Sequence, residues 1–158
     1  MLRELTLSES LWGRTSEDRH EGWRKLIEEV RAETEFAPAL TSIHIELDTS
    51  RLRLLGRDDA GAECADVLLD RAELDQLMDE YLDIVCQLGD PDRPLGVTRL
   101  EALDMAKRVV HDRAGRLLVR RGRALGLELG SARRLFSLVV ALAHDTTKLG
   151  AGLRHRRR

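Results

Sequence analysis

The spacing of apolar residues changes twice along this chain, and this change constrains the fold more than any other feature of the sequence. Leu26, Ile27 and Val30 follow Trp23 at three, four and seven positions, which is the spacing of one face of an α-helix. Charged residues occupy the other positions. The pattern therefore predicts an amphipathic helix that ends near residue 35.

In the middle of the chain the apolar period becomes two, which is the period of a half-buried β-strand. Alternating runs at residues 42–47, 51–54 and 63–69 are separated by turn sequences rich in Asp, Ser and Gly. These runs predict a three-stranded antiparallel meander. Residues 2–7 also alternate and are candidates for an edge strand, whereas residues 12–15 predict a polar turn.

From residue 70 onward the helical period returns. Asp70 and Thr98 each precede a glutamate by three positions, a capping-box spacing that predicts the start of a helix. Gly115 is expected to separate the second of these helices from another over residues 116–125. Ser131 is a suitable N-cap for a last helix, which is apolar almost all round and therefore central.

Together these elements predict an α+β fold, in which a small antiparallel sheet packs against about five helices. A chain of 158 residues is long enough to bury one core of ordinary size. We therefore expect one domain over residues 1–148, followed by a basic, disordered tail over residues 149–158.

Several classes of protein do not fit the sequence. No apolar run approaches the roughly 18–20 residues that span a bilayer, and the first residues lack the pattern of a secretory signal, so no membrane partner is predicted. Cys64 and Cys86 form no CxxC motif, which argues against a zinc site and favours reduced thiols in the cytoplasm. No nucleotide-binding glycine motif occurs, and no cofactor is predicted.

Four strings of residues resemble those of an uncharacterised bacterial protein family, number 0262. They are residues 100–112 (LEALDMAKRVVHD), 131–139 (SARRLFSLV), 19–21 (RHE) and 35–38 (EFAP). The chain departs from the family at residues 112–114, where members tend to carry an Asn-Glu-Gly-like sequence, and its last-helix histidine falls one position later. The resemblance implies a small cytoplasmic α+β domain and supplies no activity.

Two His-Asp pairs are candidates for acid–base or metal chemistry. His111-Asp112 and His144-Asp145 are each compatible with a metal-dependent hydrolase, which would need further ligands from other helices. His111 is the stronger candidate because it lies in a family-like string. The alternative is that both histidines lie near helix C-termini, where the helix dipole favours them without catalysis.

The charges divide sharply along the chain. Residues 1–90 hold 10 basic and 22 acidic residues, a net charge of −12, whereas residues 91–158 hold 16 and 6, a net charge of +10. The candidate anion-binding residues are therefore arginines of the second half: Arg113, Arg116, Arg120, Arg133 and Arg134. Arg133 and Arg134 are expected in the first turn of the last helix, a natural anion site. The alternatives are pairing with acidic residues 58–83 and plain solvation.

These observations favour a non-enzymatic interaction or regulatory domain in the cytoplasm, with a protein partner or a second copy of the chain. One alternative is arginine-mediated binding of nucleic acid or a phosphate ligand. Another is a small metal-dependent hydrolase that uses His111 and Asp112.

Overall fold

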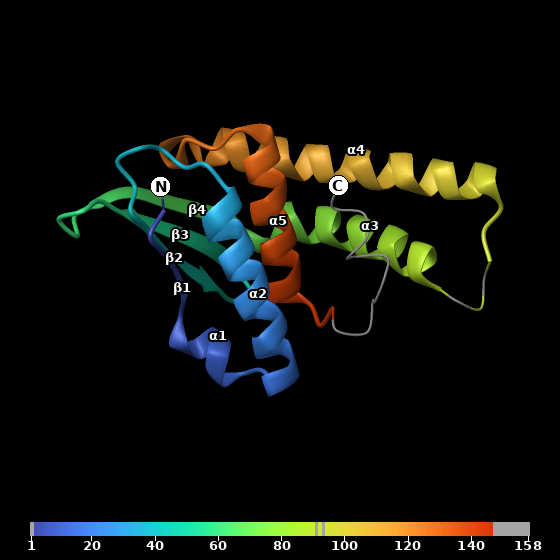
Figure 1. Cartoon of the computed structure of the whole chain (residues 1–158), viewed down its shortest axis with the longest axis horizontal. Helices are drawn as coiled ribbons and strands as arrows, with labels where there is room; N and C mark the ends of the chain where they lie inside the picture. Colours follow the sequence, from blue (N-terminus) through green and yellow to red (C-terminus); the bar gives the residue numbers. More distant parts are fainter. Residues whose placement is uncertain (1, 91, 93, 147–158) are drawn as a thin grey trace.

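The computed structural model describes residues 2–90, 92 and 94–146, and it confirms the predicted α+β fold (Figure 1). The elements, in chain order, are β1 (Glu4–Leu7), α1 (Glu9–Gly13), α2 (Glu17–Glu33), β2 (Ser42–Leu47), β3 (Arg51–Arg57), β4 (Glu63–Asp70), α3 (Arg71–Gly89), α4 (Val97–Arg121), the 3-10 turn η1 (Arg123–Leu125) and α5 (Leu129–Ala143). The basic tail predicted at residues 149–158 lies outside the described residues.

The sheet has four strands in the order β1-β2-β3-β4. The predicted meander is confirmed, because β2 pairs antiparallel with β3 and β3 pairs antiparallel with β4. The N-terminal edge strand is also present, and it runs parallel to β2, with Leu5 opposite Ile43. Parallel neighbours need a crossover connection, which α1 and α2 supply, so the sheet is mixed rather than purely antiparallel.

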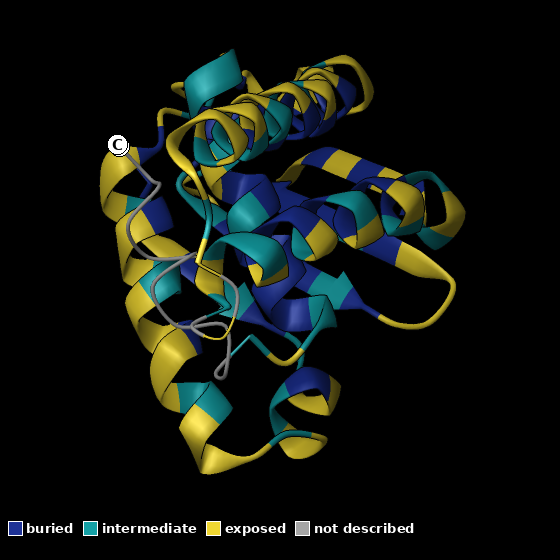
Figure 2. Cartoon of the chain, turned by 90° about the vertical axis from the view of Figure 1, so that its right-hand side faces the viewer, coloured by how far each residue is buried: buried dark blue, intermediate teal, exposed yellow. Residues whose placement is uncertain are grey.

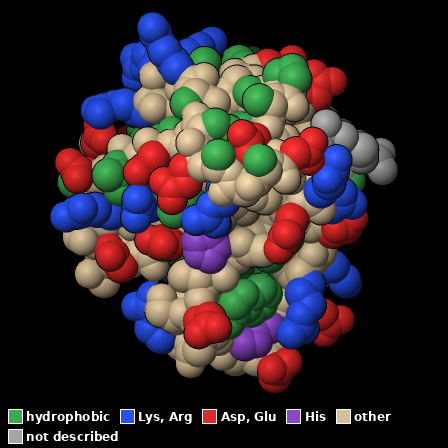
Figure 3. Space-filling model, turned by 90° about the vertical axis from the view of Figure 1, so that its left-hand side faces the viewer, with side chains coloured by type: hydrophobic (Ala, Val, Ile, Leu, Met, Phe, Trp, Pro, Cys, Tyr) green, Lys and Arg blue, Asp and Glu red, His purple; other side chains and the backbone are tan. Residues whose placement is uncertain are grey.

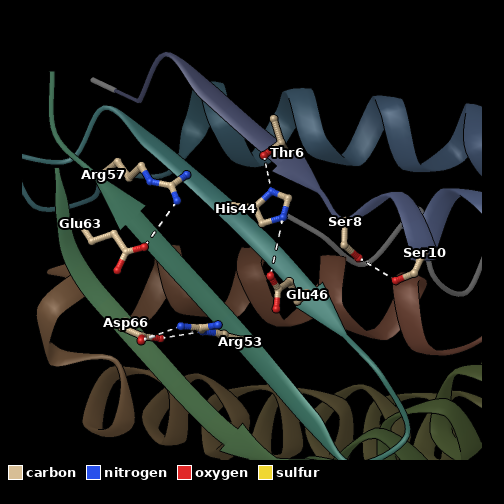
Figure 4. Close-up of polar contacts among 9 residues, drawn as sticks. All are labelled: Thr6, Ser8, Ser10, His44, Glu46, Arg53, Arg57, Glu63 and Asp66. Carbon is tan, nitrogen blue, oxygen red and sulfur yellow. Dashed lines mark hydrogen bonds and ion pairs between the residues drawn. The ribbon is translucent and has the colours of Figure 1, made fainter. Parts of the chain in front are cut away.

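The buried side chains lie between the helices and one face of the sheet. Ile45, Leu52 and Leu54 belong to this core and are fully buried, whereas Leu55 of β3 is buried outside the core cluster. Figure 2 shows the buried residues gathered where the helices face the sheet, with exposed residues on the outer sides of the helices. When the sheet is viewed from its uncovered face, α2 and α5 lie behind the strands (Figure 4).

Helix α2 is fastened to the end of α5 by two side chains. The indole Nε1 of Trp23 donates a hydrogen bond to the carbonyl of Ala141 at 3.0 Å. The Arg19 guanidinium donates to the carbonyls of Ala141 and Leu142 at 3.2 and 3.3 Å. The last carbonyls of a helix lack partners within that helix. Arg19 and Trp23 therefore cap α5 from a helix at the other end of the sequence.

The predicted helix break at Gly115 is wrong, because α4 is continuous from Val97 to Arg121. Gly115 is buried against α5, and a Cβ atom there would lie 2.9 Å from Leu129 Cδ1 and 3.1 Å from Arg133 Cγ. A glycine inside a helix costs roughly 1 kcal/mol relative to alanine. Here that cost is offset by the close approach of α5 to α4.

The predicted N-cap role of Ser131 is also wrong. Helix α5 begins at Leu129, and Glu128 occupies the N-cap position. Ser131 is fully buried inside the first turn, and its Oγ accepts a hydrogen bond from the backbone N–H of Glu35 at 3.1 Å. The serine therefore joins α5 to the segment that follows α2.

Three further local predictions differ from the structure. Helix α4 begins after Gly96, so Thr98 is not its cap, and Asp70 occupies the N-cap position of α3 without a side-chain capping bond. Residues Glu9–Gly13 form the short helix α1, which overlaps the predicted polar turn. The start of α3 after Asp70 is therefore as predicted, the start of α4 is misplaced by one or two residues, as is common at helix ends, and α1 is an additional helix.

Candidate functional site

A cleft of about 440 Å³ lies between helices α2, α4 and α5, and we call it the α2–α4–α5 cleft. Helix α2 contributes an apolar wall through Leu26 and Val30. The other two helices contribute a polar wall, whose side chains are Arg108, His111, Arg133, Arg134 and Ser137. Three of the sequence-predicted site residues therefore meet in this cleft: His111, Arg133 and Arg134.

His111 is held in the polar wall by one short hydrogen bond. Its Nε2 lies 2.9 Å from the backbone carbonyl of Arg133, and its ring packs between Tyr81 and Phe136 with centroids 5.3 and 5.9 Å away. A carbonyl oxygen only accepts hydrogen bonds, so this contact assigns the ring proton to Nε2. Burial lowers the pKa of His111, and the positive charges of Arg133 and Lys107 act in the same direction. The ring is therefore a neutral donor at neutral pH.

Ser137 lies beside His111, but the two do not form a nucleophile and its base. The Ser137 Oγ is 3.2 Å from His111 Nε2 and also 3.2 Å from the carbonyl of Arg133. Both side chains donate to that one carbonyl. A general base needs a free lone pair on the nitrogen that faces the hydroxyl, and Nε2 carries a proton instead. Ser137 is therefore a hydrogen-bonded residue of the cleft wall and not an activated nucleophile.

The predicted pair His111 and Asp112 is not brought together by the fold. Asp112 accepts a 2.8 Å hydrogen bond from the guanidinium of Arg133, whereas His111 faces the carbonyl of that residue. His111 also lies ten residues before the end of α4, so its expected position near a helix C-terminus is wrong. Within residues 2–90, 92 and 94–146 no three or more His, Cys, Asp or Glu side chains could hold a metal ion together.

The other histidines with neighbouring acids lie in separate surroundings. His144 follows the last turn of α5 as its C-cap, as predicted, and its Nε2 is buried without a partner among the described residues. His20 contacts the carbonyl of Trp12 at 2.7 Å and the hydroxyl of Thr15 at 2.6 Å. The structure therefore places the three histidines of these motifs in three different environments.

The five predicted anion-binding arginines divide between two surfaces. Arg133 and Arg134 face the cleft, and their predicted position in the first turn of α5 is wrong, because α5 begins four residues before Arg133. Arg134 lies 3.7 Å from the carboxylate of Glu33. Arg113, Arg116 and Arg120 lie on α4 outside the cleft, where Arg113 pairs with Glu80 of α3 at 3.0 Å.

A surface that sequence reasoning did not identify runs along α4, and we call it the α4 outer face. It comprises Met105, Val109, Arg116 and Arg120, which share one side of the helix because successive members are four, seven and four residues apart. Met105 is 59% exposed and Val109 is 50% exposed. Arg116 and Arg120 are exposed, and neither forms an ion pair with a residue that the structure describes. The signal available in the sequence was the pair of apolar residues outside the inward-facing stripe.

On the uncovered face of the sheet, by contrast, the charged side chains are paired with one another (Figure 4). Arg53 pairs with Asp66 through two hydrogen bonds of 3.0 Å, and Arg57 lies 3.5 Å from Glu63. Figure 3 shows acidic and basic side chains interspersed over another flank of the molecule. The charge split along the sequence therefore does not divide this flank into an acidic and a basic half.

Comparisons with known proteins give a family and no activity. The family described as "Uncharacterised protein family (UPF0262)" matches residues 1–145. A UPF0262 protein of Acidiphilium cryptum is 26% identical over 148 residues, which cover 89% of this chain and 91% of the relative. A UPF0262 protein of Dinoroseobacter shibae is 28% identical over 114 residues, 71% of each chain.

A UPF0262 protein of Jannaschia sp. is 37% identical over 84 residues, which cover 52% of this chain and 53% of the relative. No solved structure matches the chain. Every helix in the described part of the chain is too short or too polar to cross a membrane.

Proposed function

This chain belongs to the uncharacterised protein family UPF0262, whose description names no activity, and we propose from its own surfaces that it is a non-enzymatic interaction protein. Its α4 outer face docks an acidic amphipathic helix of a partner protein. The observation that carries this proposal is the order of residues along that face. The apolar Met105 and Val109 come first, followed by Arg116 and Arg120, which have no ion-pair partner among the described residues.

The two halves of the α4 outer face favour a partner of one kind. Burying a Met or Val side chain contributes about 1.5–3 kcal/mol when the burial is complete, so a half-exposed pair has roughly half of that left to gain. A guanidinium pairs best with a carboxylate, which it holds through two parallel hydrogen bonds. A helix with apolar residues at one end and glutamates at the other matches both requirements.

A second copy of the chain fits this face less well. Two parallel copies of α4 would bring Arg116 and Arg120 of one protomer against the same residues of the other, which places like charges together. Two antiparallel copies would cover these arginines with Met105 and Val109, which removes water from the guanidinium groups without supplying a partner. A separate acidic partner is therefore favoured over self-association through α4.

Nucleic acid is also a weaker candidate for this face. Phosphate binding gains affinity from several cations along the backbone, whereas half of the α4 outer face consists of the exposed apolar side chains Met105 and Val109. A DNA duplex is the probe that tests this alternative in the binding experiment.

Further observations support a cytoplasmic location, a single domain and a role without catalysis. The thiols of Cys64 and Cys86 are exposed and unpaired, which supports a reducing compartment such as the cytoplasm. The buried residues from β1 to α5 form one continuous core, which supports a single domain over residues 1–148. The Nε2 atom of His111 is bonded to the carbonyl of Arg133 and the carboxylate of Asp112 to the guanidinium of that residue, which supports a role without catalysis.

Fluorescence anisotropy with labelled probes tests the docking proposal. We expect an amphipathic peptide of about 20 residues with leucines and glutamates to bind the protein, and the same peptide with lysines in place of glutamates not to bind. A labelled DNA duplex should not bind at physiological salt. Equal binding of both peptides, or tighter binding of the duplex, would overturn the proposal.

A further inference from the structure

We infer that the α2–α4–α5 cleft binds a small molecule that carries a single carboxylate on an apolar chain. The volume of the cleft, about 440 Å³, lies within the roughly 300–1,000 Å³ that is usual for small-molecule sites. This inference concerns different side chains from those of the α4 outer face. It does not depend on the docking of a partner helix.

The cation for such a ligand is Arg108. Arg133 and Arg134 also face the cleft, but the first is bonded to Asp112 and the second to the backbone carbonyl of Glu33 at 3.0 Å. The guanidinium of Arg108 has neither a hydrogen bond nor an ion pair to any residue that the structure describes. One uncommitted guanidinium can hold one carboxylate through two parallel hydrogen bonds.

The charges that line the cleft favour a monoanion over a phosphate dianion. Three arginines and two glutamates line it. Arg133 is already paired with Asp112 and Arg134 with Glu33, which leaves the charge of Arg108 without a partner among the described residues. A carboxylate balances this charge, whereas a phosphate ester would leave excess negative charge beside Glu29 and Glu33. The lining is therefore electrostatically matched to a carboxylate.

The apolar part of the ligand is accommodated by α2. Leu26 and Val30 are one helical turn apart and line the same side of the cleft. On the opposite wall, the hydrogens of His111 and Ser137 are already directed at the carbonyl of Arg133. His111 and Ser137 therefore offer the ligand no free donor, and Arg108 is the guanidinium of that wall that sets the orientation of the ligand.

An NMR titration of the ¹⁵N-labelled protein with sodium octanoate tests the inference. We expect saturable shifts of the Gly130 and Ser137 backbone amides, which belong to lining residues. Octan-1-ol has the same apolar chain and no charge, and inorganic phosphate has charge and no chain. Both should bind at least about tenfold more weakly than octanoate, because octanol lacks the carboxylate and phosphate lacks the apolar chain.

Variants of two exposed arginines on α4 separate this site from its surroundings. R108Q should weaken octanoate binding about tenfold, and R108K should weaken it less, because lysine keeps the charge but not the two parallel hydrogen bonds. R120Q is the matched control, since it removes the same charge from the same helix outside the cleft, and octanoate binding should not change. Circular dichroism should show that all three variants are folded.

Two results would overturn the inference. One is the absence of saturable shifts at Gly130 and Ser137 with octanoate, and the other is equal octanoate affinity in R108Q and the parent protein. The docking proposal fails separately, because R108Q should leave binding of the acidic peptide unchanged.

Discussion

Two charged surfaces of this molecule differ in how their charges are satisfied. On the uncovered face of the sheet, Arg53 and Arg57 each face a carboxylate on the neighbouring strand. On the α4 outer face, Arg116 and Arg120 face no carboxylate among the described residues. An exposed arginine that already has a partner gains little from a second one. The arginines of the sheet face are therefore already neutralised within the chain. The arginines of the α4 outer face can still form ion pairs with a partner.

The α4 outer face exists because α4 is one continuous helix. Replacement of Gly115 should disturb this helix more than any other change considered below. G115V would place new methyl groups against Leu129 and Arg133, where a Cβ alone already lies at 2.9 and 3.1 Å. Overpacking of this kind costs about 1–3 kcal/mol. Chemical denaturation should show a loss of unfolding free energy in that range.

The matched glycine for this test is Gly22, in the middle of α2. A Cβ there meets no atom within 4 Å. G22A should raise the free energy of unfolding by about 0.4–1 kcal/mol, because alanine loses less backbone entropy on folding. If G115V were as stable as the parent protein, the close packing of α4 and α5 would not be what maintains the continuous helix.

Charge reversal compares the two surfaces directly. R116E with R120E changes the net charge by −4, as does R53E with R57E. The first pair should weaken binding of the acidic peptide about tenfold or more, since each substitution removes an attraction and adds a repulsion. The second pair should leave peptide binding unchanged and lower the midpoint of thermal unfolding, because Asp66 and Glu63 would each face a like charge.

Equal losses of peptide binding in the two double variants would show that net charge, and not the α4 outer face, determines binding. Anisotropy at two salt concentrations separates these cases further, because non-specific attraction between exposed charges is screened at high salt.

Removal of the apolar half of the α4 outer face should have a smaller effect. M105S with V109S should weaken peptide binding about fivefold, because each side chain is only half available for further burial. The thermal midpoint should hardly change, since both side chains are exposed in the free protein. L68S is the control, because Leu68 is 49% exposed on β4 and should not affect the peptide.

The smallest expected effect is a change of stability with pH. It arises at His111, which is buried between the helices, and not on the uncovered face of the sheet. Burial lowers the pKa of His111 in the folded state. As the pH falls through the unfolded-state pKa of about 6.5, the unfolded chain binds a proton that the folded chain resists, so stability is lost. Above that pH the contribution of His111 to stability is fully present.

H111Q should reduce this dependence on pH. Unfolding free energies measured at pH 7.5 and 5.5 should differ less in H111Q than in the parent protein. An unchanged difference would show that other groups control the response to acid in this range.

The sequence predicted the sheet well because strand alternation is a local signal. The meander of β2, β3 and β4 follows directly from alternation and turn composition. Gly115 and Ser131 were misinterpreted for one common reason. Each has a strong local preference, as a helix breaker and as a helix cap, and each instead serves a contact with a distant segment. Tertiary packing overrides local propensity at such positions.

The candidate site was less predictable than the fold. His111, Arg133 and Arg134 were identified from the sequence, but their common cleft depends on α2, whose residues lie about a hundred positions away. Arg108 could not be distinguished from the other arginines of α4 by sequence, because what sets it apart is that it lines the cleft and has no ion-pair partner among the described residues. Such an absence is a property of the packed helices and not of any local motif.

The capping of α5 by α2 also sets the order in which the molecule can be completed during synthesis. The bonds from Trp23 and Arg19 join residues 118, 122 and 123 positions apart. The meander and the α3–α4 pair involve short loops and can form while the chain is still being made. The α2–α4–α5 cleft cannot form until α5 has left the ribosome, so a nascent chain completes α4 before this cleft.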